Sequence, residues 1–160
     1  MSEQIVVLPV GIVHNPLTDP VDDGWDSVQS RIDLDETRFT AECLVGLDEF
    51  SHVEVVFLLH RVPEDEVCAG TRHPRGRSDF PPVGIFAQRG RNRPNRIGVT
   101  VCRLLAVRET SIEVEGLDAI DGTPVLDIKP YIREFAPRGT VRQPRWSTEL
   151  MARYWSPAKA

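Results

Sequence analysis

Short runs of apolar residues recur along this chain, and many of them alternate with polar residues. Such alternation is typical of β-strands that bury one face. It is clearest over residues 111–117, where Ile and Val alternate with Glu. Residues 53–59 are almost continuously apolar, which predicts a strand at the centre of the core. The predicted strands are residues 5–13, 28–34, 53–59, 83–87, 98–107, 111–117 and 125–128.

Turn-forming residues separate these strands. Asn15-Pro16 ends the first strand, and Asp121-Gly122 predicts a tight turn. Residues 18–26 are expected to form a loop, and residues 47–50 a short helical turn. Residues 61–82, rich in Pro, Gly and charge, predict a long loop, and long loops inside compact domains are usually functional.

The C-terminal end differs in composition from the predicted strands. Residues 136–147 are rich in Arg and Pro and predict an extended arm. Ser147 or Thr148 is expected to cap a short helix that reaches Trp155.

Seven short strands with almost no helix predict an all-β barrel or sandwich. The 160 residues fit one domain. The functional residues are then expected on the connections between strands.

Composition and cysteine usage exclude several classes of protein. The chain is 41% hydrophobic and 27% charged, as in ordinary soluble proteins, and no apolar run approaches the roughly 20 residues of a membrane helix. It opens Met-Ser-Glu-Gln, without the pattern of a signal peptide. Cys43, Cys68 and Cys102 are too far apart in sequence to suggest a zinc site or a dithiol. We expect reduced, mostly buried thiols in a cytoplasmic protein, no membrane association and no metal.

Charge is distributed unevenly along the chain. The net charge is −5, but residues 1–60 carry 2 basic and 12 acidic side chains, whereas residues 61–110 carry 10 basic and 5 acidic ones. A basic face on an acidic protein can still bind a phosphate backbone, because salt screens charges beyond about 8 Å.

The basic residues concentrate in residues 84–98. Arg89, Arg91, Arg93 and Arg96 lie within eight positions, and the preceding loop adds Arg72, His73, Arg75 and Arg77. Guanidinium groups suit bidentate contacts with phosphate or carboxylate. The alternative is a charged, solvent-exposed hairpin end.

A second candidate segment covers residues 116–131. Residues 121–124, Asp-Gly-Thr-Pro, can present backbone groups and a hydroxyl to a polar ligand. Asp127 and Lys129 lie two apart on a predicted strand and so face the same side, either as a plain ion pair or as groups that hold a substrate. His60 ends the central strand, as a satisfied edge residue or as a base. The sequence contains no dinucleotide-binding glycine motif, no phosphate-binding loop and no nucleophile elbow.

Several segments resemble one known family. Read in order, they are Gly-Ile-Val-His-Asn-Pro (residues 11–16), Gly-Leu-Asp-Glu-Phe-Ser-His (46–52), Gly-Ile-Phe-Ala-Gln-Arg (84–89), Arg-Pro-Asn-Arg-Ile-Gly (93–98) and the stretch 118–131, which ends Asp-Ile-Lys-Pro-Tyr. Together they resemble the TrmO/TsaA-like family of tRNA methyltransferases.

The resemblance implies a single closed β-barrel over residues 1–135, followed by an arm and short helix over 136–160. It implies S-adenosylmethionine as cofactor without a Rossmann domain, tRNA as partner and a homodimer. The family reaction is N6-methylation of threonylcarbamoyl-adenosine next to the anticodon. The implied cofactor contacts are His60, Arg61, Arg89, Val99, Asp121, Gly122, Thr123 and Pro124.

Roles for the remaining candidates follow from the chemistry of methyl transfer to a carbamoylated nitrogen, which a base would assist. The candidate bases are Asp127, Tyr131 and His60, in that order, with Lys129 holding a substrate carboxylate or phosphate. The expected RNA contacts are Arg75, Arg77, Arg91, Arg93, Asn95 and Arg96. Two other functions stay open: a methyltransferase of this fold with another RNA or small-molecule substrate, and a non-catalytic S-adenosylmethionine-binding protein.

Overall fold

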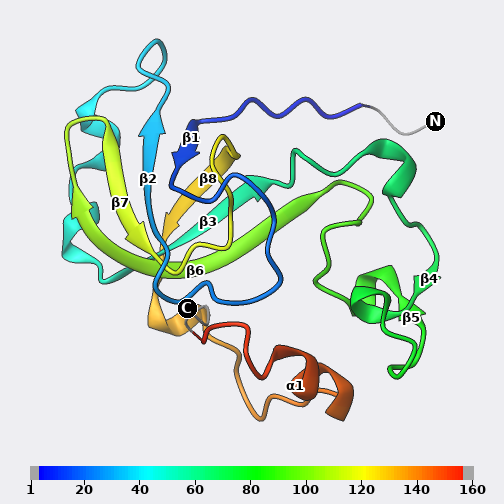
Figure 1. Cartoon of the computed structure of the whole chain (residues 1–160). Helices are drawn as coiled ribbons and strands as arrows, with labels where there is room; N and C mark the ends of the chain where they lie inside the picture. The colour runs from blue at the N-terminus through cyan, green and yellow to red at the C-terminus, as the bar shows by residue number, and fades with distance from the viewer. Residues whose placement is uncertain (1–3, 157–160) are drawn as a thin grey trace.

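Six antiparallel strands close into a barrel in the computed structural model, which describes residues 4–156 (Figure 1). The order around the barrel is β1-β2-β7-β6-β3-β8. The all-β barrel prediction is confirmed. The barrel strands are β1 (Gly11–His14), β2 (Gln29–Leu34), β3 (His52–Leu58), β6 (Ile97–Val107), β7 (Ser111–Glu115) and β8 (Pro124–Pro130).

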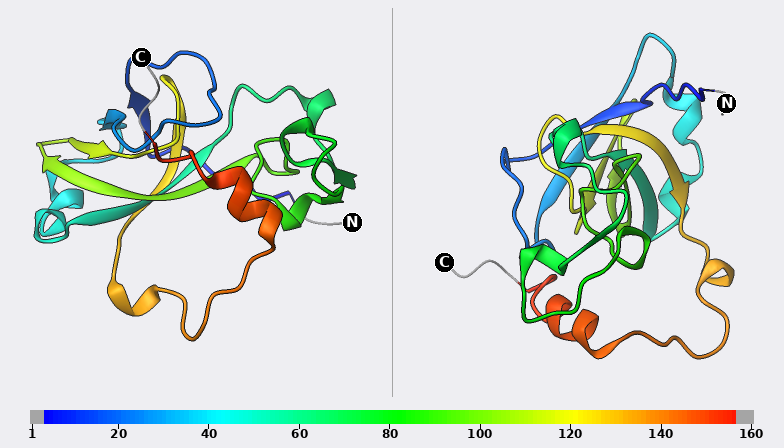
Figure 2. Two further views of the ribbon diagram at one scale, coloured as in Figure 1. Left: turned by 60° about the horizontal axis from the view of Figure 1, so that its bottom comes forward. Right: turned by 90° about the vertical axis from the view of Figure 1, so that its right-hand side faces the viewer.

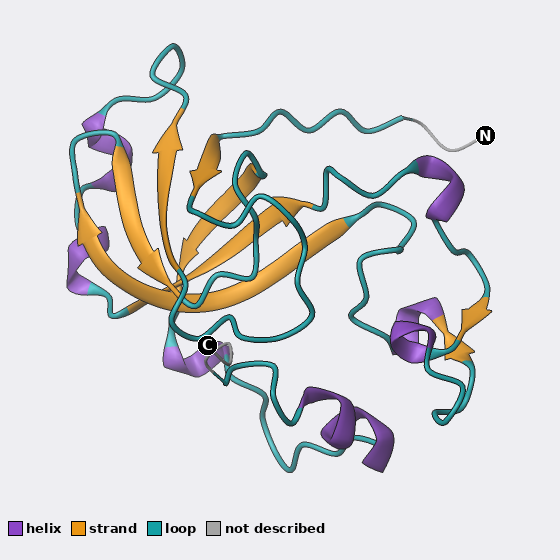
Figure 3. Ribbon diagram, viewed as in Figure 1, coloured by secondary structure: helices purple, strands orange, loops and turns teal. Residues whose placement is uncertain are grey.

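The helices are short and lie outside the barrel (Figure 3). The 3-10 turns are η1 (Ala41–Leu44), η2 (Leu47–Glu49), η3 (Glu64–Glu66), η4 (Pro74–Gly76), η5 (Ile85–Ala87) and η6 (Arg133–Phe135), and the α-helix is α1 (Arg145–Met151). The turn predicted over residues 47–50 corresponds to η2.

Residues 61–96 leave the barrel after β3 and return at β6, and Figure 1 shows them as a separate green lobe. This arginine lobe contains a two-stranded sheet of β4 (Thr71–Arg72) and β5 (Val83–Gly84). The long loop predicted for residues 61–82 therefore has short elements of its own.

The core fills the barrel from alternate positions of each strand. Val53, Val55 and Phe57 of β3 are at most 2% exposed, while the residues between them are half-buried. The strand predicted at the centre of the core is therefore present, and its side chains alternate in burial because an antiparallel barrel strand turns only one face inward. Ile112 and Val114 of β7 complete the same core.

Three predicted elements differ from the structure. Residues 5–8 are 57–85% exposed, and β1 begins only at Gly11, because Pro9 cannot donate a ladder hydrogen bond. The predicted strand 83–87 ends at Gly84 and continues as η5, since its two-residue partner β4 offers no longer ladder. Helix α1 begins at Arg145, so Ser147 lies inside it and donates its hydroxyl to the Pro144 carbonyl at 2.8 Å instead of capping.

Antiparallel pairing sorts the loops into two groups. One end of the barrel, here called the site end, collects the last residues of β1, β3 and β7 and the first residues of β2, β6 and β8. The opposite end collects the start of β3 and the end of β8, where His52 and Tyr131 are joined by a 2.9 Å backbone hydrogen bond. Loops at one end can meet, whereas loops at opposite ends are separated by a strand length.

A glycine in β6 allows Phe57 to pack in the core. A Cβ at Gly98 would lie 2.4–3.0 Å from the Phe57 ring, which is 2% exposed and cannot move aside. We expect Gly98→Ala to lower the free energy of unfolding by about 1–3 kcal/mol, because overpacking strains a dense core. Urea denaturation measures the change. Gly90→Ala is the control, because a Cβ there meets nothing within 4 Å, and equal stability of the two variants would contradict the prediction.

Candidate functional site

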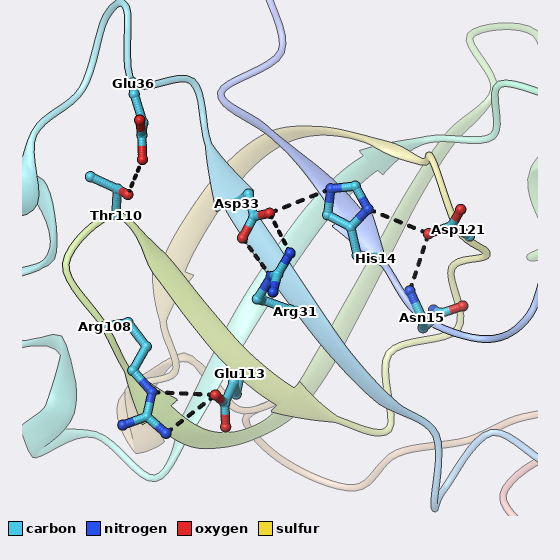
Figure 4. A network of polar contacts seen from close by, with 9 residues as sticks. All are labelled: His14, Asn15, Arg31, Asp33, Glu36, Arg108, Thr110, Glu113 and Asp121. Atoms are coloured by element: carbon cyan, nitrogen blue, oxygen red, sulfur yellow. Dashed lines mark hydrogen bonds and ion pairs between the residues drawn. The ribbon is translucent and has the colours of Figure 1, made fainter.

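The turn between β7 and β8 is anchored to the end of β1. The Asn15 backbone N–H donates to Asp121 Oδ1 at 3.2 Å, and His14 Nδ1 lies 3.5 Å from the same oxygen (Figure 4). Gly122 has φ of 76°, a left-handed conformation that favours glycine, and its N–H donates to the Val13 carbonyl at 2.8 Å. Thr123 is buried. The predicted tight turn is therefore present, and its groups are held in fixed positions.

His60 lies beside this turn. A Cβ at Gly122 would come to 4.0 Å from His60 Nε2, so the glycine leaves open space next to the imidazole. Burial lowers the pKa of His60, and the neighbouring Arg61 guanidinium lowers it further. The imidazole is thus kept neutral and available as a proton acceptor.

Two arginines reach the same end of the barrel. Arg61 donates to the Thr18 carbonyl and lies 3.6 Å from Asp19. Arg89 donates to the Val99 carbonyl at 2.7 Å. The eight predicted cofactor residues therefore all lie at the site end, although they come from four separate places in the sequence.

Three further residues at this end were not predicted as site residues. Asp118 accepts hydrogen bonds from the hydroxyls of Thr100 and Tyr154, one on each carboxylate oxygen. Burial and the Asp118 carboxylate raise the pKa of Tyr154, so its phenol remains a donor. The arm gave no pattern that identified Tyr154, because its contact spans 36 residues of sequence.

The candidate bases are not together within one chain. Asp127 forms an ion pair with Lys129 and accepts the Ile128 N–H at 2.9 Å, and this pair is about half exposed. The Asp127 carboxylate raises the pKa of Lys129. Tyr131 lies at the opposite end. At about 3.3 Å per strand residue it is roughly 20 Å from Pro124, far beyond hydrogen-bonding reach of His60.

A cavity of about 420 Å³ also lies toward the opposite end, between β8 and the segment that carries η1 and η2. Its lining is mainly apolar, with Phe39, Leu47 and Ile128, and Asp127 lies at its wall. The cavity is therefore separate from the cluster around His60.

The arginines expected to bind RNA fall into two groups. Arg75 forms a bidentate contact with Asp23 at 2.9 and 3.2 Å, and Arg77 pairs with Asp79. Arg93 and Arg96 use part of their donors on backbone carbonyls of the lobe, whereas Arg91 and Asn95 are exposed. Only part of the predicted positive charge is therefore free of internal partners.

The cysteines match the expected chemistry only in part. All three are free. Burial, together with Asp118, raises the pKa of Cys102 to about 12, which keeps it an inert thiol. Cys43 is exposed and Cys68 is half-buried, so the expectation of mostly buried thiols was wrong.

Within residues 4–156, no three His, Cys, Asp or Glu side chains gather as metal ligands. In the same part of the chain, no helix has the length and apolar character needed to span a bilayer.

The fold and the site define a small closed antiparallel barrel with a fixed cluster of polar groups at one end. Residues 20–136 match the tRNA-methyltransferase O N-terminal domain family. The chain is 33% identical over 135 residues to a Methanothermobacter thermautotrophicus protein named a probable S-adenosyl-L-methionine-binding protein, covering 82% of this chain and 93% of that one. It is 42% identical over 92 residues to mouse tRNA (adenine(37)-N6)-methyltransferase, covering 58% of this chain and 21% of the relative.

A crystal structure of TrmO from Pseudomonas aeruginosa has the same fold, with a TM-score of 0.73 and 27% identity, covering 91% of this chain and 63% of that one. The chain therefore belongs to the TrmO family, and the resemblance drawn from its motifs is confirmed. It spans about a fifth of the mouse relative's length.

The lowered pKa of His60 predicts a pH-dependent stability. Below pH 6.5 the unfolded chain binds a proton at His60 more readily than the folded chain, so the free energy of unfolding falls as pH decreases through this range. We expect His60→Gln to remove this pH-dependent contribution to the free energy of unfolding. The difference in free energy of unfolding between wild type and variant should then shrink from pH 7.5 to pH 5. Urea titrations at both values measure it. The difference should stay constant between pH 7.5 and 9, and parallel curves down to pH 5 would contradict the prediction.

Proposed function

We propose that this protein is an S-adenosylmethionine-dependent methyltransferase that methylates N6 of threonylcarbamoyl-adenosine next to the tRNA anticodon. One observation carries the proposal: His60, the Arg89–Val99 contact and the Asp121–Thr123 turn come together at one end of a TrmO-family barrel. The names of the mouse and archaeal relatives support the cofactor and the substrate.

The groups at the site end suit this cofactor. Guanidinium groups of Arg61 and Arg89 match its carboxylate, and the Asp121 carboxylate matches an ammonium or ribose hydroxyl. Val99 and Pro124 offer apolar surface, and Gly122 leaves space beside His60. When bound, the cofactor supplies an electrophilic methyl group on a sulfonium. The surrounding residues have to hold the acceptor nitrogen in line with that methyl, about 3–3.5 Å away.

RNA binding is assigned to the arginine lobe. Arg91 and Asn95 are exposed, and Arg93 and Arg96 each keep guanidinium donors beyond one contact with a backbone carbonyl. Arg75 and Arg77 can join only by exchanging an aspartate for a phosphate. A tRNA substrate would place the protein in the cytoplasm.

The separation of the candidate bases leads us to propose a homodimer. Within one chain only His60 lies at the site end, whereas Asp127, Lys129 and Tyr131 are elsewhere on the barrel. A two-fold pairing across the outer face of β3 and β6 could bring the end of one β8 to the partner's site end. Side chains on β6 support an interface there, since Ile97, Val101 and Leu105 are 38–45% exposed.

The same separation favours one alternative. If the chain is a monomer, Tyr131 lies too far from an acceptor held near His60 and Asp127 stays paired with Lys129, which favours a non-catalytic cofactor-binding protein.

Labelled methyl transfer tests the function directly. We expect label from S-adenosylmethionine to enter tRNA that carries threonylcarbamoyl-adenosine, and not the same tRNA without this modification. Arg89→Ala should weaken cofactor binding about tenfold or more in calorimetry, because it removes a charge-assisted contact. Arg108→Ala is the control, since Arg108 lies in the turn between β6 and β7 at the opposite end of the barrel, where it pairs with Glu113 (Figure 4). Cofactor binding without any transfer would leave the non-catalytic alternative.

Subunit complementation tests the shared site. His60→Ala and Asp127→Asn should each be inactive, whereas co-refolding them in equal amounts should restore about a quarter of wild-type activity. Half of the dimers are then hybrids, each with one intact site and one doubly altered site. If all catalytic groups act within one chain, the mixture cannot exceed the mean of the two single variants.

A further inference from the structure

The C-terminal segment crosses from one end of the barrel to the other. It leaves β8 at the opposite end, passes through η6 and returns to the site end, and in both views of Figure 2 its helix α1 lies beside the arginine lobe. The family match ends at residue 136, so this segment follows the matched residues. We call residues 137–156 the C-terminal strap.

One contact of the strap is with the barrel. The Tyr154 hydroxyl donates to Asp118, which lies three residues before Asp121 in the anchored turn. The Tyr154 carbonyl accepts the N–H groups of Gly24 at 2.9 Å and Trp25 at 3.2 Å. Side chain and backbone of one residue thus hold the strap to two loops at the site end.

The second contact is with the arginine lobe. The Trp146 ring packs against Phe80 with centroids 6.5 Å apart, and the Arg77 guanidinium lies 4.2 Å from the Phe80 ring centroid. Phe80 is 5% exposed, and its carbonyl contacts His73 Nδ1 at 2.7 Å. Trp146 therefore packs on Phe80, a buried residue of the lobe.

The lobe has few other means of fixing its position. Its buried apolar side chains are Val62, Pro74, Phe80 and Ile85, and its sheet pairs only two residues on each strand. Besides the chain connections, contacts of three arginines tie the lobe to the barrel and its loops: Arg61–Thr18, Arg75–Asp23 and Arg89–Val99. Segments with so few buried contacts open locally at low free-energy cost.

We propose that the C-terminal strap fixes the arginine lobe against the site end, and that Tyr154 and Trp146 are positioning residues for cofactor and RNA binding. The strap contacts Phe80 in the lobe and Asp118 beside the Asp121–Thr123 turn. It therefore fixes the position of Arg89 relative to that turn. The functional part of this inference rests on the proposed function, whereas its structural part can be tested without any ligand.

Two single variants and their combination test the strap. Tyr154→Phe removes only the hydroxyl that binds Asp118, and Trp146→Ala removes the contact with Phe80. Thr110→Val is the matched control, because it removes a hydroxyl that donates to Glu36 in an exposed turn at the opposite end. The first readout is amide hydrogen exchange of Ile85 and Gln88, whose N–H groups donate within the lobe. The second is the Kd for S-adenosylmethionine and for tRNA.

Each single variant should speed exchange of the lobe amides about fivefold and raise both Kd values by a similar factor, with exchange in β3 unchanged. Trp146→Phe should restore most of the Trp146 effect, because an aromatic ring can still pack on Phe80. The double variant should be no worse than the more affected single variant, since a strap released at one end is already ineffective.

The proposal would be overturned if the lobe amides of Tyr154→Phe exchanged at the wild-type rate. It would also be overturned if the fold-changes of the two single variants multiplied in the double variant. Tighter cofactor binding by Tyr154→Phe would also overturn it, because the strap would then block the site. If wild type binds neither ligand, the proposed function fails, and hydrogen exchange still decides whether the strap fixes the lobe.

Discussion

The pairing of β3 on both of its edges is the constraint on which the rest of the molecule depends. β3 is hydrogen-bonded to β6 along all seven of its residues and to β8 over most of them, and it contributes Val53, Val55 and Phe57 to the core. The seam between β1 and β8, in contrast, pairs only two residues of each strand. The β6-β3-β8 sheet therefore fixes the register, and the other strands close around it.

This register decides which chemical groups can work together. His60 follows β3 and reaches the turn that precedes β8, whereas His52 at the start of β3 meets Tyr131 after the end of β8. Because β8 is extended, the residues that flank it, Thr123 and Tyr131, lie a strand length apart. The motif at residues 118–131 is continuous in the sequence, but its residues are thus divided between the two ends of the barrel. That division, rather than any missing residue, is the argument for a second subunit.

The sequence predicted local structure well and long-range contacts poorly. Alternation located β2, β7 and the long β6, because a half-buried antiparallel strand imposes a period of two on its side chains. The same pattern made the first predicted strand too long, because the effect of Pro9 on pairing depends on which strand lies beside it. It also predicted a strand where η5 forms, because Ile and Phe are common in strands. Asp118, Thr100 and Tyr154 could not be found from pattern, because their contacts join residues 18 and 36 positions apart. The family resemblance supplied the candidate cofactor residues, but their grouping at one end required the fold.

The unequal distribution of charge along the sequence has a structural counterpart at the site end. The acidic loop between β1 and β2 supplies Asp19 to Arg61 and Asp23 to Arg75, so part of the lobe's positive charge is neutralised within the chain. The same loop supplies Gly24 and Trp25, which hold the strap through the Tyr154 carbonyl. A phosphate that binds Arg75 must displace a carboxylate next to the residues that anchor the strap. The proposed binding of a polyanion would therefore be coupled to the position of the lobe through one loop, and the acidic N-terminal third of the chain would limit nonspecific binding by the arginines.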